Sequence, residues 1–241
     1  MNKLSELMTQ AQERLKHGGN WWDGLHPDLV PYLIPSRVLG TILQAPLVVD
    51  IMPIAEICNY RYESKRAAMA EATAAEDWDR VFVLYERPWR LTKLWEAWLY
   101  EQMPLEALRE QLAWVWTDAE SPLKALTPGD VIAMFRDVGY ISDSDQPQPL
   151  SGTRLYRGCS PRYTRGVSWS LDPKQALWFA NRWSGSAGAP AKNRVYYADV
   201  KPKDILGIFV GRGEWEVVVD SHNIRPHIFD TESLRRTAKR S

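Results

Sequence analysis

The stretch VSWSLDPKQALWFANR, residues 167–182, decides how the second half of this chain is interpreted. It opens with a short β-type run. Asp172, Pro173 and Gln175 then stand where the N-cap, first and third residues of a helix would be, which predicts a capping box. The apolar face of this helix is expected to comprise Ala176, Leu177, Phe179, Ala180 and Trp183. The stretch therefore predicts a strand that is followed directly by a capped helix.

The rest of the C-terminal part is rich in strand-type sequence. Four more β-type runs lie between residues 154 and 220, namely RLYRG, RVYYADV, ILGIFV and EVVVD. Ahead of them, residues 142–152 (SDSDQPQPLSG) are polar and rich in Pro and Ser, which indicates a linker or loop.

The first 140 residues are mainly of helical type. Helical spacing of apolar residues is found in two sets: Leu4, Leu7, Met8, Ala11 and Leu15, and Leu105, Leu108, Leu112 and Val115. A third helix is predicted from Thr127 as N-cap, Pro128 as first residue and Gly139 as C-terminal cap. The predicted fold class is therefore α+β, with helices first and strands later.

Size and composition exclude several classes of protein. A chain of 241 residues can form one large domain or two small ones. Cys58 and Cys159 show no metal-ligand spacing and the four histidines form no ligand motif, so no metal is implied. With only two cysteines a disulfide framework is not expected, and a reducing cytoplasm is the expected location. The N-terminus lacks a signal-peptide pattern, and prolines and charged residues interrupt the most apolar stretch, residues 39–58, so no membrane segment is expected.

The charge is balanced overall but unevenly distributed. Residues 153–241 hold 16 Lys and Arg against 8 Asp and Glu, a net charge of +8, and the first 152 residues carry −8. A basic part of this kind is typical of a site for a polyanion. Mutual attraction between the two parts explains the same pattern, and both interpretations stay open.

Two glutamates lie one residue apart in GRGEWEVVVD, residues 211–220. In a strand, Glu214 and Glu216 would project to the same face. Such a pair either protects a solvated sheet edge from unwanted strand pairing or carries out chemistry.

Three short motifs stand in a characteristic order: LYRG with Arg157, VSWSL with Ser168 and Ser170, and GEWEVVV with Glu214 and Glu216. This order resembles the Arg, Ser-x-Ser, Glu-x-Glu signature of the ADP-ribosyltransferases of the diphtheria- and cholera-toxin superfamily, on the cholera-toxin-like branch. The resemblance covers about residues 154 to 220. It implies a mixed, split β-sheet catalytic core over residues 153–229, preceded by a mainly helical region, 1–145, and followed by a basic tail, 230–241.

The resemblance implies catalytic roles that suit the chemistry of NAD. Cleavage of the nicotinamide–ribose bond builds an oxocarbenium-like charge, which a fixed carboxylate stabilises as it develops. The resemblance gives this role to Glu216, which would hydrogen-bond a ribose hydroxyl. Glu214 would orient or deprotonate the acceptor, and Ser168 would hydrogen-bond the ribose and Glu216.

Further residues are implied to bind NAD. Arg157 would contact its phosphates or the adjoining ribose, because a guanidinium is always charged and forks onto phosphate oxygens. Gly158 would allow close approach of nicotinamide to the backbone. Ser170 is also implied to be an NAD-binding residue. Phe179 would stack on nicotinamide, and Arg182 would make a second phosphate contact.

Each of these residues also has a structural interpretation. Arg157 is compatible with a strand surface, the serines with strand ends, Phe179 with helix packing and Arg182 with a solvated helix end. Only eleven positions separate Arg157 from Ser168, which leaves little room for helices between them, and the β-rich segment is also short for a free-standing catalytic domain. We therefore expect N-terminal helices, residues 87–139 included, to complete the catalytic fold, and the alternative is that residues 1–152 bind a partner.

The function implied by the resemblance is that of a mono-ADP-ribosyltransferase of bacterial or phage type, with NAD as substrate and no metal. In the family, Glu at the first Glu-x-Glu position accompanies transfer to protein arginine, whereas Arg162, Arg165 and the basic tail suit a nucleic-acid acceptor. Because such an enzyme would harm its own cell, we expect a toxin of a toxin–antitoxin or phage-defence system with an antitoxin partner. The alternatives are an NAD glycohydrolase with the same site and a non-catalytic phage interaction protein.

Overall fold

The computed structural model describes residues 3–119, 126–144, 146–182, 193–211, 213 and 215–231. The chain divides into two compact units. Unit 1 comprises the described residues up to Leu94 together with Asp118 and Ala119, and unit 2 comprises residues 95–117 and the described residues from 126 onward. Both units contain helices and strands, so the prediction of an α+β protein is confirmed.

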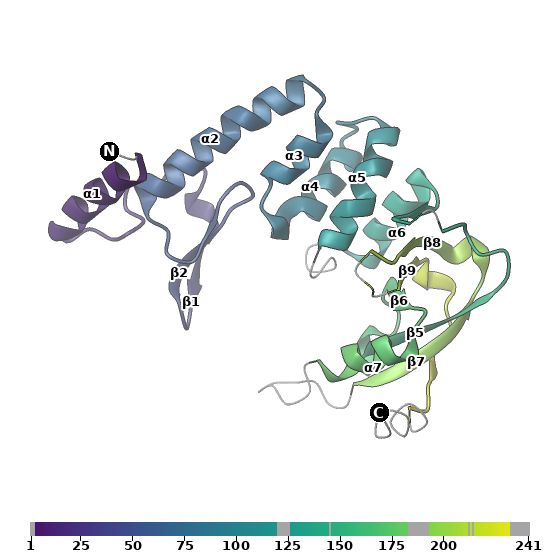
Figure 1. Ribbon diagram of the computed structural model, residues 1–241. Helices are drawn as coiled ribbons and strands as arrows, with labels where there is room; N and C mark the ends of the chain where they lie inside the picture. The colour runs from purple at the N-terminus through teal and green to yellow at the C-terminus, as the bar shows by residue number, and fades with distance from the viewer. Residues whose placement is uncertain are drawn as a thin grey trace. The chain divides into compact units, whose positions relative to one another are not determined.

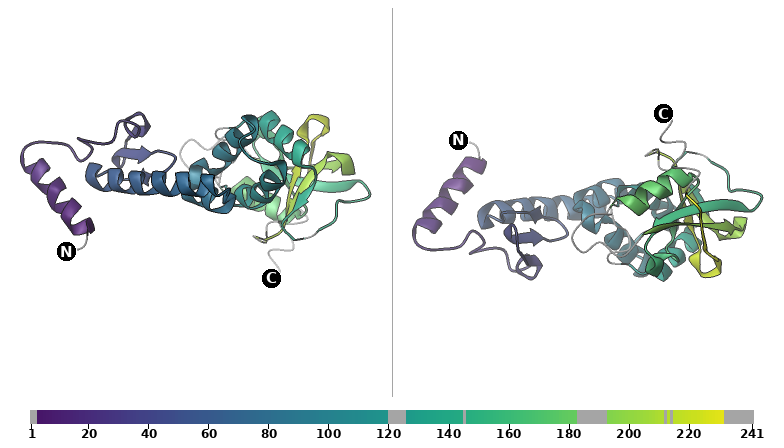
Figure 2. Two further views of the ribbon diagram at one scale, coloured as in Figure 1. Left: turned by 90° about the horizontal axis from the view of Figure 1, so that it is seen from above. Right: turned by 90° about the horizontal axis from the view of Figure 1, so that it is seen from below.

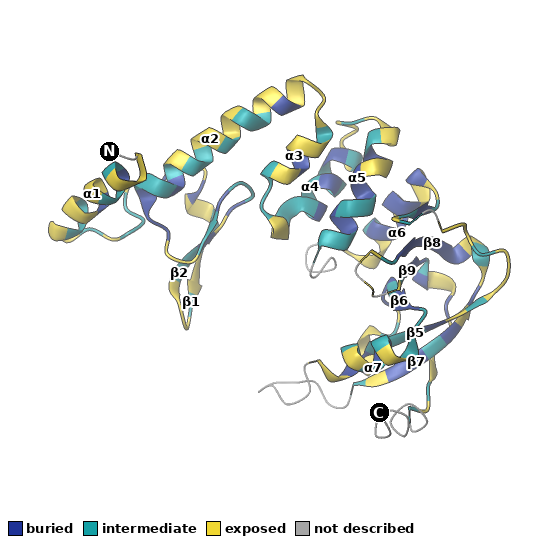
Figure 3. Cartoon of the chain, viewed as in Figure 1, coloured by how far each residue is buried: buried dark blue, intermediate teal, exposed yellow. Residues whose placement is uncertain are grey.

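Unit 1 contains a small sheet that the sequence did not predict. Its strands form a three-stranded antiparallel sheet in chain order, with the bounds β1 (Leu33–Ser36), β2 (Gly40–Gln44) and β3 (Val49–Asp50). The helices that begin in this unit are α1 (Lys3–Lys16), α2 (Ala55–Ala74), α3 (Trp78–Leu84) and α4 (Arg90–Leu99). Its core contains Leu25, Leu29, Leu43, Val48 and Cys58. The tip of the β1–β2 hairpin is exposed, as Figure 3 shows.

The predicted N-terminal helix is confirmed as α1, and an ion pair fixes it to α2. The Nε and Nη2 atoms of Arg14 each lie 3.0 Å from a carboxylate oxygen of Glu56. This two-point contact holds both side chains in one plane, which is the geometry in which arginine binds carboxylates most strongly. It also lowers the pKa of Glu56.

Unit 2 is built on a seven-stranded sheet in the order β10-β7-β5-β6-β9-β8-β4 among the described residues. Among the described strands, β4 and β8 pair in parallel and the other neighbours pair antiparallel, so the sheet is mixed. Figure 1 labels β5, β6, β7, β8 and β9 of this sheet. The strand bounds are β4 (Ile141–Ser142), β5 (Thr153–Cys159), β6 (Ser168–Ser170), β7 (Arg194–Val200), β8 (Ile205–Phe209), β9 (Glu216–Val219) and β10 (His227–Ile228). The helices are α5 (Leu105–Asp118), α6 (Pro128–Val138) and α7 (Pro173–Asn181).

The helices of unit 2 begin where the sequence predicts. Thr127 and Asp130 form a reciprocal capping box at α6, with N···O distances of 3.2 Å and 2.9 Å between each backbone nitrogen and the other side chain. Asp172 caps α7 by accepting a hydrogen bond from Lys174 N at 2.8 Å. The reciprocal bond from Gln175 that a capping box requires is not among the hydrogen bonds of the described residues. The loop predicted over residues 142–152 is confirmed except at its first residue, because Ser142 belongs to β4, and residues 143–152 contain no helix or strand where they are described.

Helices cover one face of the sheet at two places. Helix α7 packs on β5 and β7 through Ala176, Ala180 and Val195, and Figure 2 shows the green α7 alongside the sheet in the view from below. Helix α6 packs on β8, where the rings of Phe135 and Phe209 lie 6.3 Å apart. The other face carries the larger apolar core, which includes Leu155, Trp169, Ala198, Ile208 and Val217.

Candidate functional site

The described residues of the predicted site come mainly from three neighbouring strands. Arg157 and Gly158 lie on β5, Ser168 and Ser170 on β6, and Glu216 is the first residue of β9. These strands are adjacent in the sheet, with β6 in the middle. The fold thus brings together segments that are far apart in the sequence, since Ser168 pairs with Val218, which lies 50 positions further along the chain.

The strand register places Ser170 and Glu216 side by side. Ser170 is paired with Tyr156 on one side and with Glu216 on the other, and Glu216 is paired with Phe209 of β8. Directly paired residues of antiparallel strands point to the same face, so these four residues share one face. Ser170, and not Ser168, is therefore the cross-strand neighbour of Glu216, whereas Ser168 pairs with Val218.

This face is the one that α6 and α7 cover. Phe209 contacts α6 through Phe135, and Tyr156 packs against the cluster that anchors α7. Ser170 and Glu216 lie on β6 and β9, between the strands on which those two helices pack, as Figure 1 shows. The buried Ser170 and the half-buried carboxylate of Glu216 therefore lie side by side on this helix-covered face of the sheet.

The segment before Glu216 has an unusual backbone conformation. Trp215 adopts a left-handed φ of 47°, which is uncommon for a residue with a side chain. Its carbonyl oxygen accepts a hydrogen bond from Leu171 N at 3.1 Å, which ties the start of β9 to the turn between β6 and α7. Glu214, the other predicted carboxylate, lies outside the described residues. Strained backbone conformations of this kind persist only where the surrounding structure holds them, and they are frequent at functional sites.

Arg157 holds the loop between β5 and β6. Its Nε donates to the carbonyl oxygen of Tyr163 at 3.0 Å, and its Nη1 donates to the carbonyl oxygen of Ser168. A Cβ atom on Gly166 would lie 3.0 Å from this Nε and closer still to Nη2, so the guanidinium packs flat against a glycine. Burial lowers the pKa of Arg157, and the nearby Cys159 and Glu216 partly offset that effect.

The side chains of Arg157 and Ser170 project from opposite faces of the sheet. Strand side chains alternate, and the missing Cβ of Gly158 points at α7, so Arg157 leaves β5 on the opposite side. The structure therefore gives Arg157 a positioning role through two backbone carbonyls. Its predicted contact with NAD phosphates stays a prediction.

Gly158 is needed for helix packing. A Cβ atom at this position would lie 2.6 Å from Ala180 N and 2.9 Å from the carbonyl carbon of Ala176. Distances under 3.0 Å are essentially never seen for real Cβ atoms. The glycine therefore lets α7 approach β5, which is a different close approach from the predicted one to nicotinamide.

Phe179 lies on α7, Arg182 directly follows the last residue of this helix, and both contact Trp178. The rings of Trp178 and Phe179 meet edge to face at 5.0 Å, and the guanidinium of Arg182 lies 5.1 Å from the centre of the Trp178 ring. Trp178 is 51% exposed. Its four-residue spacing from Arg182 was the sequence signal for this cation–π contact, because residues four apart are neighbours on a helix.

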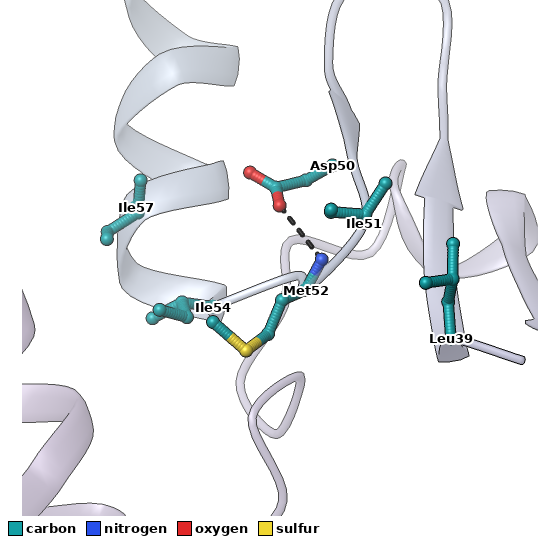
Figure 4. Close-up of a pocket in the computed structure, with 6 residues that line it drawn as sticks. All are labelled: Leu39, Asp50, Ile51, Met52, Ile54 and Ile57. Atoms are coloured by element: carbon teal, nitrogen blue, oxygen red, sulfur yellow. Dashed lines mark hydrogen bonds between the residues drawn. The ribbon is translucent and has the colours of Figure 1, made fainter.

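Unit 1 contains a pocket that is lined mainly by apolar side chains. It has a volume of about 420 Å³ and is lined by Leu39, Asp50, Ile51, Met52, Ile54 and Ile57 (Figure 4). The carboxylate of Asp50 accepts a hydrogen bond from Met52 N at 3.0 Å and pairs with Arg61 at 3.0 Å. This largely apolar lining is poorly suited to the two phosphates and two riboses of NAD, which need hydrogen-bond donors.

The chain matches no protein-family model, no curated protein sequence and no solved structure. Among the described residues, no group of three or more His, Cys, Asp or Glu side chains is arranged to hold a metal ion. None of their helices combines the length and apolar character that crossing a membrane requires.

Proposed function

We propose that this chain is a mono-ADP-ribosyltransferase, which moves ADP-ribose from NAD to a macromolecular acceptor and releases nicotinamide. The observation that carries the proposal is the adjacency of β5, β6 and β9, because it gathers the Arg, Ser-x-Ser and Glu motifs in one part of one sheet. Motifs that matched the signature by chance would have no reason to occupy three neighbouring strands.

The chemistry assigned to Glu216 fits its surroundings. The carboxylate is half-buried, flanked by Ser170 across the strand pair, and close enough to Arg157 for the two charges to attract each other. A carboxylate held in this way is preorganised to stabilise positive charge that develops on the ribose. The attacking acceptor then forms a bond to the ribose C1′ as the nicotinamide leaves with the electron pair of the broken bond.

The test is a nicotinamide-release assay on the purified full-length chain. Glu216→Gln is expected to lower the rate by about 100-fold or more, which corresponds to the loss of roughly 2.7 to 4 kcal/mol of transition-state stabilisation. Glu106→Gln is the matched control, because Glu106 is an exposed residue in the first turn of α5 and should leave the rate unchanged. Equal rates for both variants and the wild type would contradict the proposal.

The same assay separates transfer from hydrolysis. With NAD labelled in its adenylate part, label on macromolecules indicates a transferase, and free ADP-ribose alone indicates an NAD glycohydrolase. Glu214→Gln is expected to spare hydrolysis more than transfer, since the resemblance assigns this residue to the acceptor. If neither product forms and nicotinamide is not released, the chain is a non-catalytic binding protein.

The proposal extends to the role of the enzyme in a cell. An ADP-ribosyltransferase that acts in the cytoplasm of its own cell needs control, so we place it in a toxin–antitoxin or phage-defence system with an antitoxin partner. Induced expression in bacteria should arrest growth for the wild type and not for Glu216→Gln. Unimpaired growth with both proteins would refute the toxin role without bearing on the chemistry.

A further inference from the structure

The pocket of unit 1 opens among exposed apolar side chains. Leu39, Ile51 and Met52 line it and are 53%, 64% and 54% exposed, and Val38, which precedes Leu39, is 89% exposed. Figure 4 shows that Leu39 comes from a different segment than Ile51 and Met52. We call these four residues, together with the pocket, the apolar surface. Single exposed apolar residues are ordinary, but a group that shares one pocket marks an interaction site.

The tip of the β1–β2 hairpin, residues 37–39, has a defined shape. The hydroxyl oxygen of Ser36 accepts hydrogen bonds from Val38 N at 3.4 Å and from Leu39 N at 3.2 Å. Gly40 closes the loop with a positive φ of 77°, which is typical of three-residue hairpin loops. Because the tip is already ordered, Val38 loses little conformational entropy when it contacts a partner.

Strand addition is a poor way to cover this part of unit 1. Among the described strands, β1 pairs with β2 alone, so its other edge is open. Pro35 in β1 has no backbone N–H to offer to a further strand. A partner is therefore expected to contact the side chains of the apolar surface.

The charges beside the apolar surface do not suit a membrane. Surfaces that bind anionic lipids combine exposed apolar residues with several Lys or Arg residues. Residues 33–52 contain one cation, Arg37, and one acidic residue, Asp50. The carboxylate of Asp50 already accepts a hydrogen bond from Met52 N and pairs with Arg61, both at 3.0 Å. A surface with so little unpaired charge favours an apolar protein partner and does not repel a copy of itself.

The area of the apolar surface favours such a copy. A specific interface buries about 800 Å² on each partner, and smaller interfaces are weak and transient. Four exposed side chains supply only the centre of an interface of that size. In a two-fold dimer the same surface lies on both partners, so each of these side chains is buried twice and the apolar area is doubled.

We propose that the apolar surface joins two copies of this chain in a weak two-fold dimer, in which the hairpin tip of each copy enters the pocket of the other. Val38 is the most exposed residue of the tip. The pocket, with about 420 Å³, lies within the range of roughly 300–1,000 Å³ that encloses small ligands, so it has room for a valine side chain. This dimer involves unit 1 alone and does not depend on the proposed function.

Sedimentation equilibrium of the full-length chain between about 1 and 100 μM measures the dimer, since weak complexes dissociate in this range. The average mass is expected to rise with concentration from that of a monomer towards that of a dimer. Val38→Glu and Met52→Lys should each weaken dimerisation about tenfold or more, because a charge would be buried in the apolar contact. Val83→Glu is the matched control, because Val83 is 58% exposed on α3 of the same unit and does not line the pocket. It should dimerise like the wild type.

A mixture of the two variants tests the exchange of tip and pocket. In the mixed dimer, the intact tip of Met52→Lys meets the intact pocket of Val38→Glu, and the new glutamate meets the new lysine at the other contact. The mixture should therefore associate more tightly than either variant alone, which a surface that is merely sticky would not produce.

Three results would each overturn the inference. They are a wild-type chain that stays monomeric up to about 100 μM, equal losses for Val83→Glu and Val38→Glu, and a mixture that associates no better than its components. Binding of a monomeric wild-type chain to anionic phospholipid vesicles, lost in Val38→Glu, would replace the second copy by a membrane. Nicotinamide release is measured separately, so this inference and the proposed function can fail independently.

Discussion

Replacing Gly158 by alanine is expected to force helix α7 away from strand β5. The new Cβ atom would lie 2.6 Å from Ala180 N, 2.9 Å from the carbonyl carbon of Ala176 and closer still to its oxygen. These are backbone atoms, so no side-chain rotation relieves the clash. Bringing the contact with Ala180 N to an ordinary 3.4 Å requires the two backbones to separate by about 0.8 Å, and relieving the closer contact with the carbonyl oxygen of Ala176 requires more than that.

The energetic cost follows from that separation. Overpacking of a tight interior typically costs 1–3 kcal/mol, and the upper end, about 3 kcal/mol, applies where the obstacle is backbone. The shift would also loosen the contacts of Ala176 and Ala180 with Val195, which form the core beneath α7. For a protein of this size, about 3 kcal/mol corresponds to a fall of roughly 6 to 12 °C in melting temperature.

Thermal unfolding followed by circular dichroism measures the effect. Gly152→Ala is the matched control, because the nearest atom to its new Cβ, the carbonyl oxygen of Val200, would be 3.8 Å away, an ordinary contact. The control should melt within about 2 °C of the wild type. If Gly158→Ala melts together with Gly152→Ala, α7 does not pack on β5 as described and the layout of the site is wrong.

Two further predictions concern titratable groups. Burial raises the pKa of Asp220, but hydrogen bonds from Arg136, at 3.0 Å, and from His222 outweigh it and hold the pKa below its usual value. A lowered carboxyl pKa stabilises the fold at pH values above the pKa of the unfolded state, and this contribution is lost as the pH falls. Arg136→Gln should therefore lower the free energy of unfolding by about 1 kcal/mol at neutral pH and by progressively less below about pH 4. Urea unfolding at a series of pH values measures this difference. A deficit that is constant down to pH 3 would contradict this reasoning. Burial raises the pKa of Cys58 to about 12. A thiol reagent at about pH 8 should therefore leave Cys58 unmodified in the folded protein and modify it in urea. Rapid labelling of Cys58 in native buffer would show that the core around it is not formed as described.

Local sequence signals predicted α1, α5, α6 and α7, because caps and apolar periodicity act within a few residues, whereas α2, α3 and α4 were covered only by the general expectation of helix in the first 140 residues. Thr127 and Pro128 start α6, and Gly139 ends it with a positive φ of 74°. The sheet of unit 1 was missed for the opposite reason. Its strands are two to five residues long, β1 contains Pro35, and strand formation in such segments depends on partners more than on intrinsic preference.

The candidate site was predictable as a set of residues but not as a set of contacts. The β-type runs predicted that Ser170 and Glu216 lie on strands, yet only the register makes them direct neighbours. Likewise, the glycine in LYRG was expected to admit a ligand, and the space is taken by α7. Register and helix approach are set by contacts between distant segments, which a single sequence does not display.

Arg157 shows how one side chain can fix the shape of a loop. A guanidinium has five N–H donors in a planar fork. Two of these donors go to the carbonyl oxygens of Tyr163 and Ser168. The guanidinium therefore holds the loop between β5 and β6 from the sheet face opposite to Ser170 and Glu216. Lysine lacks this planar fork, so the position favours arginine for reasons of shape as well as charge.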